Sequence, residues 1–201
     1  MLKQAILSSA VLALSLIACG PKLEPQEPCN FVMNSSSQRV SWKDQTPIVM
    51  YLHRSVPAQY HAAIQEAMNS WNRSLGRPIL SIGGIVDGDG NPGRDGVSVI
   101  YWMQGWDSDR RDEQARTTIY WVGAQIREAD IRVNDRDFDY SVGVLTASTV
   151  DLKSLILHEL GHVLGLAHTH DSKSVMAERL ANGIDRSSPT SEDVSSLRCE
   201  Y

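Results

Sequence analysis

The eleven residues 158–168 read His-Glu-Leu-Gly-His-Val-Leu-Gly-Leu-Ala-His, and they constrain this chain more than any other stretch. On a helix, His158 and His162 are four residues apart and share one face. Their imidazoles suit zinc, and an open zinc site needs a third protein ligand, which His168 can supply. Gly165 provides the left-handed residue at which the chain can turn. The pattern therefore predicts one metal ion held by His158, His162 and His168.

Glu159 adjoins a ligand but has no ligand spacing, so its carboxylate is predicted to lie beside the metal and to act as a general base. The opposite stripe of this helix is apolar, which predicts that it is buried. Zinc-dependent peptide hydrolysis uses a metal, a water and a base in this arrangement.

Composition and charge narrow the classes of molecule that this chain can bind. The chain has 201 residues, 42% of them hydrophobic, which is enough for one well-buried domain with appendages. Its formal net charge is −5, and its Lys and Arg residues are scattered, so the basic footprint of a nucleic-acid-binding protein is missing. We therefore expect no nucleic-acid partner.

Residues 1–18 have the features of a signal peptide: Lys3 gives a positive start, and a largely apolar run follows that is shorter than the roughly 20 residues of a spanning helix. Residues 16–19, Leu-Ile-Ala-Cys, resemble the bacterial lipobox, which implies cleavage before Cys19 and a lipid on its sulfur. The next residue is Gly20 and not Asp, which by analogy with lipoprotein sorting in Gram-negative bacteria favours the outer membrane. The alternative is an ordinary secretory signal with a chance cysteine.

Residues 19–41 are polar and proline-containing, so we expect a lipid-anchored tether followed by a single domain over residues 42–201. With Cys19 assigned to the lipid, Cys29 and Cys199 remain, and an exported chain with two cysteines suggests one disulfide. The alternative is a free Cys29 thiol that reaches the metal and keeps an enzyme latent.

Apolar patterning predicts strands at 48–52, 79–82, 97–102, 115–122 and 126–133. A helix is expected from Pro57 to Gly76, a second over 151–164 after a capping box at 148–151, and a short third one after Thr190. Between two of the strands, residues 87–96 carry carboxylates at alternate positions, as calcium loops do. Pro92 stands where an EF-hand has its turn glycine, so we expect a solvated turn, with calcium binding as the alternative.

The full motif, met at His158, Glu159, His162, Gly165 and His168, resembles that of the metzincin zinc metallopeptidases. Met176 follows the third histidine by eight residues, the spacing of the Met-turn in matrixins, the matrix metalloprotease-like enzymes. The resemblance covers roughly residues 42–201.

This resemblance implies an α+β fold: a five-stranded, mostly parallel twisted sheet with residues 115–121 as an antiparallel edge strand, two main helices, and a small C-terminal part with a third helix. It also implies one catalytic zinc and an extended peptide that pairs with the edge strand. Residues 177–180, Ala-Glu-Arg-Leu, depart from the Pro and Tyr that usually wall the specificity pocket of matrix metalloproteases.

The expected function is a lipid-anchored, zinc-dependent endopeptidase of the cell envelope that acts on peptide or protein substrates. One alternative is a surface-anchored module that keeps the zinc fold and cleaves nothing. Another is zinc chemistry on a substrate other than protein.

Overall fold

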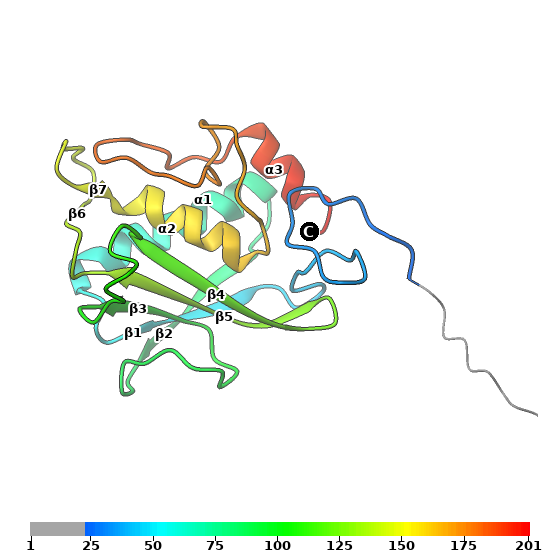
Figure 1. The fold of residues 1–201 in the computed structure, drawn as a ribbon, viewed down its shortest axis with the longest axis horizontal. Coiled ribbons are helices and arrows are strands. Elements are labelled where there is room, and N and C mark those ends of the chain that lie inside the picture. The colour runs from blue at the N-terminus through cyan, green and yellow to red at the C-terminus, as the bar shows by residue number, and fades with distance from the viewer. Residues whose placement is uncertain (1–22) are drawn as a thin grey trace, which may run out of the picture.

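Five strands form one sheet, which a computed structural model shows within residues 23–201, the part of the chain that it describes (Figure 1). The order across the sheet is β2-β1-β3-β5-β4, and only β4 runs antiparallel to its neighbour. The predicted α+β fold with a mostly parallel sheet is confirmed. The strands are β1 Ile48–His53, β2 Leu80–Val86, β3 Val99–Met103, β4 Ala115–Val122 and β5 Gln125–Asn134.

β2 is longer than predicted. Gly83 and Gly84 are typical of the end of a strand, but the chain runs through them with a change of register against Met50 and Tyr51 of β1. A Cβ on Gly83 would lie 2.6 Å from the Tyr51 ring, and Gly84 has a φ of 132°. Glycine is thus required here by a bulge within the strand.

β4 is an edge strand, as predicted. It pairs with β5 in a hairpin that turns at Gly123, which has a φ of 64°. No strand formed by residues 23–201 pairs with its outer edge. Thr117 lies opposite Ile131, and Thr118 lies opposite Asp130. Because adjacent strand residues point to opposite faces, Thr117 and Asp130 face opposite sides of the sheet.

Two helices pack on one face of the sheet (Figure 1). They are α1 His61–Leu75, preceded by the 3-10 turn η1 Ala58–Tyr60, and α2 Leu152–Val163. Trp71 of α1 is fully buried, and its indole N–H donates to the Leu157 carbonyl of α2 at 3.0 Å. α1 ends at Gly76, a left-handed C-cap with a φ of 70°.

The predicted capping box at 148–151 is wrong. Val150–Asp151 instead form β7, which pairs with β6 Tyr140–Ser141, and Asp151 is the N-cap of α2. Its carboxylate accepts from the backbone N–H of Ser154 at 2.9 Å. The buried side chains of Tyr140 and Val150 anchor this strand pair, so the residues directly before α2 stay extended. The helix α3, Ser191–Leu197, begins at Thr190 with a capping box, as predicted.

The end of the predicted tether belongs to the domain. Residues 29–41, here called the strap, return along the fold: Phe31 bridges to Leu166, Ser41 bridges to Gln125, and Val40 is fully buried. These residues thus pack with the fold ahead of the expected domain start at residue 42. Phe31 and Val40 are too far apart in the sequence to create an apolar period, yet both cover the chain where it leaves α2.

The predicted signal peptide and Cys19 lie outside the described residues. Among the helices formed by residues 23–201, none has the length and apolarity needed to cross a bilayer.

Candidate metal centre and cleft

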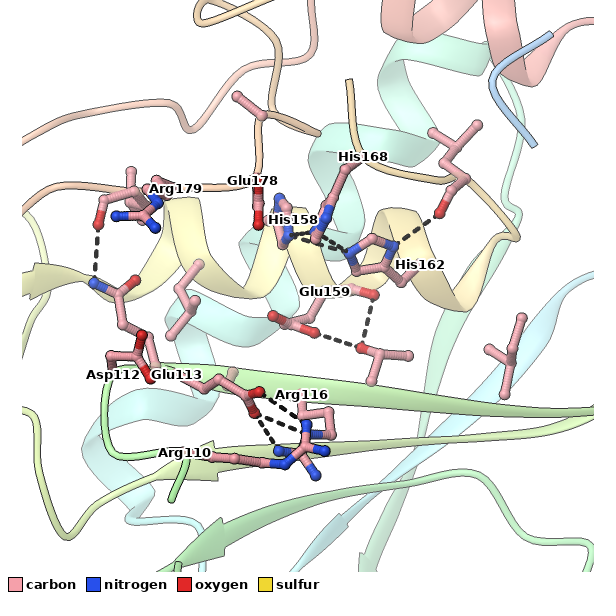
Figure 2. A pocket seen from close by; sticks show the side chains of 18 of the residues that line it. Arg110, Asp112, Glu113, Arg116, His158, Glu159, His162, His168, Glu178 and Arg179 are labelled. Carbon is pink, nitrogen blue, oxygen red and sulfur yellow. Dashed lines mark hydrogen bonds and ion pairs between the residues drawn. The ribbon is translucent and has the colours of Figure 1, made fainter. Parts of the chain in front are cut away.

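The three predicted ligands converge. α2 carries His158 and His162, and the turn after it brings back His168 (Figure 2). The Nε2 atom of His162 lies 3.1 Å from that of His158 and 3.0 Å from that of His168, and the remaining pair is 3.2 Å apart. Among residues 23–201, this is the only group of three such side chains placed to hold one ion.

Hydrogen bonds on the other ring nitrogen orient two of these histidines. Nδ1 of His158 lies 2.7 Å from the Val175 carbonyl, and Nδ1 of His162 lies 2.8 Å from the Leu166 carbonyl. A carbonyl only accepts, so each Nδ1 carries a proton, and Nε2 is the nitrogen that can offer a lone pair to a metal. Lone pairs at this separation repel each other unless a cation lies between them.

The donor set fits zinc. Tetrahedral zinc with Zn–N bonds of about 2.0–2.1 Å has ligand atoms about 3.3 Å apart, close to the observed spacing. Burial, followed by the charge of His162, lowers the pKa of His158 to about 3. Burial and His162 also lower the pKa of His168, against an opposing effect of Glu178. These two imidazoles are therefore neutral at neutral pH, the form that binds a metal.

Glu159 lies between the triad and β4 (Figure 2). Its carboxylate Oε2 accepts a hydrogen bond from the Thr117 hydroxyl at 2.6 Å, and this hydroxyl is also 3.2 Å from the Glu159 carbonyl. Glu159 is buried, and burial raises its pKa, while His162 and Thr117 act in the opposite direction. A carboxyl held beside the cleft with a raised pKa has the proton affinity that a general base needs. Sequence reasoning did not identify Thr117, because no motif marks it.

The turn that returns His168 depends on Gly165, as predicted, and on the strap, which was not predicted. Gly165 has a φ of 99°, and a Cβ there would lie 2.3 Å from the Val40 carbonyl. Asn30 makes two bonds to Ala167: its carbonyl accepts from the Ala167 N–H at 2.8 Å, and its side-chain amide donates to the Ala167 carbonyl at 3.0 Å. The Val32 N–H donates to the Gly165 carbonyl at 2.9 Å.

A disulfide fixes the start of the strap. The structure joins Cys29 to Cys199, with their Cα atoms 6.4 Å apart, just beyond the end of α3. In this arrangement Cys29 has no free thiol to offer a metal. The two cysteines were therefore also the one sequence signal that the strap returns to the domain.

Met176, the residue expected in a Met-turn, packs against α2. It is fully buried, and a Cβ added to Gly161 of α2 would lie 2.2 Å from its sulfur. Asp193 at the start of α3 supports this turn through bonds to the Ser174 hydroxyl and, at 3.2 Å, to the Val175 N–H. Packing between Gly161 and Met176 thus sets the height of α2 above the turn.

A cavity of about 800 Å³ opens in front of the triad (Figure 2). β4 forms one rim through Ala115, Thr117 and Ile119, and the segment after Met176 forms the other. This wall segment, residues 177–181, contains the predicted departure from the Pro and Tyr of matrix metalloproteases. Leu166, which follows α2, and Val32 of the strap also line the cavity.

The calcium alternative for residues 87–96 gains no support. Asp89 accepts from the Asn91 N–H at 3.1 Å, and Asp87 pairs with Arg54, as in a solvated turn. Below this loop, on the sheet face opposite the cleft, Glu128 and Asp130 bind the N–H groups of Gly96 and Val99. Within residues 23–201, these carboxylates do not converge with a third potential ligand as the histidines do.

Comparisons with known proteins agree with this geometry. The chain is 35% identical over 65 residues to Metalloendoproteinase 2-MMP of Arabidopsis thaliana, a stretch that covers 32% of this chain and 17% of that protein. The chain thus spans less than a fifth of the length of this relative. The model of the matrixin family matches residues 92–201, more than half of the chain, and includes β4, the triad and the Met-turn. This chain therefore belongs to the matrixin family.

Proposed function

We propose that this chain is a zinc-dependent endopeptidase in which Glu159 is the general base. The observation that carries the proposal is the convergence of three histidine Nε2 atoms beside a buried carboxylate, at the rim of a cavity bordered by the outer edge of β4, with which no strand within residues 23–201 pairs. Membership in the matrixin family supports peptidase activity. Zinc-dependent peptide hydrolysis uses all three features.

The residues have separate tasks. His158, His162 and His168 would hold the zinc, which when bound acts as a Lewis acid and lowers the pKa of water. Glu159 takes the proton of the attacking water and then delivers it to the nitrogen of the departing amine. Thr117 donates to one carboxylate oxygen and keeps the other directed to the cleft. The outer edge of β4 offers backbone groups to an extended peptide.

The test is cleavage of a diverse peptide library by the soluble domain, beginning at Gln26 so that the strap and its disulfide are retained. Each reaction is run as prepared, after treatment with a chelator, and after zinc is restored. We expect cleavage within the peptides that the chelator abolishes and zinc restores. Peptides that bind without being cleaved in the zinc-loaded protein would instead support the surface-anchored binding module.

We further propose that Cys19 anchors the mature chain to the bacterial cell envelope through a lipid, the outer membrane being favoured by Gly20. Hydrogen bonds tie Glu24, Gln26 and Glu27 to the strap, so about five residues separate Cys19 from the anchored chain, a reach of at most about 18 Å. The cleft would therefore work close to the membrane surface. Mass spectrometry of the protein from membranes should find the lipid on Cys19, and an unmodified Cys19 in the mature chain would refute the anchor.

A further inference from the structure

The two rims of the cleft are joined at one end by a single side chain. Gln114, directly before β4, donates from its side-chain amide to the backbone carbonyl of Leu180 in the wall segment at 2.9 Å. The bond is drawn as a dashed line near Arg179 in Figure 2. It spans the cavity from the start of β4 to the opposite rim, and both Gln114 and Leu180 line this cavity.

Both ends of this bridge rest on anchored backbone. The Gln114 carbonyl accepts from the Asn134 N–H at 2.9 Å and from the Tyr140 hydroxyl at 2.9 Å, and both of these donors belong to buried residues. The side chain of Leu180 is partly buried against the core. Neither end can move away without breaking other contacts, so the bridge is part of the cleft.

Arg186 holds the wall segment from its far side. Its guanidinium donates to the carbonyls of Ser174 at 3.3 Å and Ala177 at 3.2 Å, and also to that of Arg179. No carboxylate forms an ion pair with Arg186 among the described residues, and burial lowers its pKa. The guanidinium thus uses its donors on the wall backbone, which keeps the Leu180 carbonyl facing β4.

The bridge limits the space along β4. An extended peptide that pairs with the edge of β4 passes the catalytic groups beside Thr117, whose hydroxyl binds Glu159. Gln114 lies three residues before Thr117, a distance of about 10 Å in a strand. About three peptide residues therefore fit between the scissile bond and the bridge. At the other end, within residues 23–201, no hydrogen bond joins the lining at Leu166 and Val32 to β4.

We propose that Gln114 is a specificity-determining residue that closes one end of the cleft, so that the enzyme prefers substrates with about three residues or fewer on that side of the scissile bond. This inference rests on the proposed peptidase function. The expected substrates end, or bend away from the sheet, a few residues from the scissile bond on one side only. A flexible terminus or an exposed loop of a protein substrate meets that requirement.

The experiment measures kcat/KM on two peptide series built around one cleaved sequence. One series is lengthened residue by residue on the amino side of the scissile bond, and the other on the carboxyl side. In the wild type, lengthening beyond about three residues on one side should lower kcat/KM about five- to tenfold, as expected when the peptide must break one hydrogen bond. Lengthening on the other side should have no such effect.

Two variants test the bridge. Gln114→Ala removes it, and Gln114→Glu replaces the donor by an acceptor of the same size; both keep the backbone carbonyl that anchors this position. Each should bring the rates of long and short peptides to within about twofold. Gln104→Ala is the matched control, because Gln104 is exposed and bonds to Asp135 at 3.4 Å. This control should retain the wild-type length preference. Thermal melting and zinc content check that all variants are folded and loaded.

The outcomes separate the two proposals. If the wild type cleaves peptides but tolerates lengthening on both sides, or if its length preference is unchanged in both Gln114 variants, the bridge does not set specificity and the peptidase function stands. If the zinc-loaded wild type cleaves no peptide of any length, the peptidase function itself is wrong.

Discussion

The two faces of the sheet around β5 both hold a buried carboxyl group with a raised pKa, yet only one of them forms a candidate active site. On the cleft face, Glu159 meets Thr117, three histidines and a cavity. On the opposite face, Asp130 accepts one backbone N–H at 3.1 Å, and its Oδ2 atom is buried without a partner among the described residues. Burial raises the pKa of Asp130 to about 7. A perturbed pKa therefore marks a site only where ligands and space for a substrate converge.

The histidines of the two faces give the largest contrast. His162→Ala should abolish stoichiometric zinc binding and peptide cleavage, because it removes one of the three converging ligands. His53→Ala should keep one zinc per folded chain, because His53 lies on the other face against Tyr101. Metal analysis of both purified variants is the measurement. Full zinc occupancy in His162→Ala would refute its role as a ligand.

Asp130 should make stability depend on pH. Burial raises its pKa from the ordinary 3.8 of an aspartate to about 7 in the fold, so the folded protein holds this proton more tightly than the unfolded chain does. The stabilisation is full below about pH 4 and is lost as the pH rises through about 7. Asp130→Asn keeps a neutral side chain, so its free energy of unfolding relative to the wild type should increase by a few kcal/mol over this range.

Urea unfolding at pH 5 and pH 8 measures this difference, with Asp109→Asn at an exposed position as the control. If the difference in stability between the wild type and Asp130→Asn were the same at both pH values, Asp130 would not be held protonated.

Packing also differs between the two faces. Gly161→Ala would place a Cβ 2.2 Å from the Met176 sulfur, so we expect a loss of about 1–3 kcal/mol in the free energy of unfolding. Gly93→Ala, in the loop on the opposite face, meets nothing within 4 Å and should be close to neutral. Chemical denaturation compares the two variants. Equal stabilities would mean that the Met-turn yields to the added methyl group.

The smallest expected effect concerns the strap. Asn30→Gly removes the side-chain bond to Ala167, and glycine accepts the φ of 61° found at this position. Losing one hydrogen bond beside His168 should weaken zinc binding about fivefold. Competition with a chromophoric chelator measures this affinity. An unchanged affinity would show that the Gly165 turn positions His168 without the strap.

Local sequence patterns predict the core of the candidate metal centre, and contacts between residues far apart in the sequence complete it. The spacing of His158, Glu159 and His162 follows from one helical turn, so sequence alone places them together. By contrast, Asn30 and Ala167 are 137 residues apart, Gln114 and Leu180 are 66 apart, and Thr117 and Glu159 are 42 apart. Each of these contacts depends on how the strap, the wall segment and β4 pack, which no periodicity encodes.

The differences between the predicted and the observed elements have one physical cause. The polar residues of the strap predict a tether, although Phe31 and Val40 are buried. The capping pattern before α2 lies too early, because Val150–Asp151 form a short strand before the helix begins. Because Gly83 and Gly84 are typical of a strand end, the sequence does not predict the second half of β2. In each case, tertiary packing overrides a local signal.

The assignment of Glu159 as the base is tested most directly by Glu159→Gln, which keeps the size of the side chain and its position beside Thr117 while removing the base. Bound zinc per chain and kcat/KM for a cleaved peptide are measured on the same preparation. We predict full zinc occupancy with a loss of about 10²- to 10⁴-fold in kcat/KM. Undiminished cleavage by the zinc-loaded variant would contradict the assignment of Glu159 as the general base.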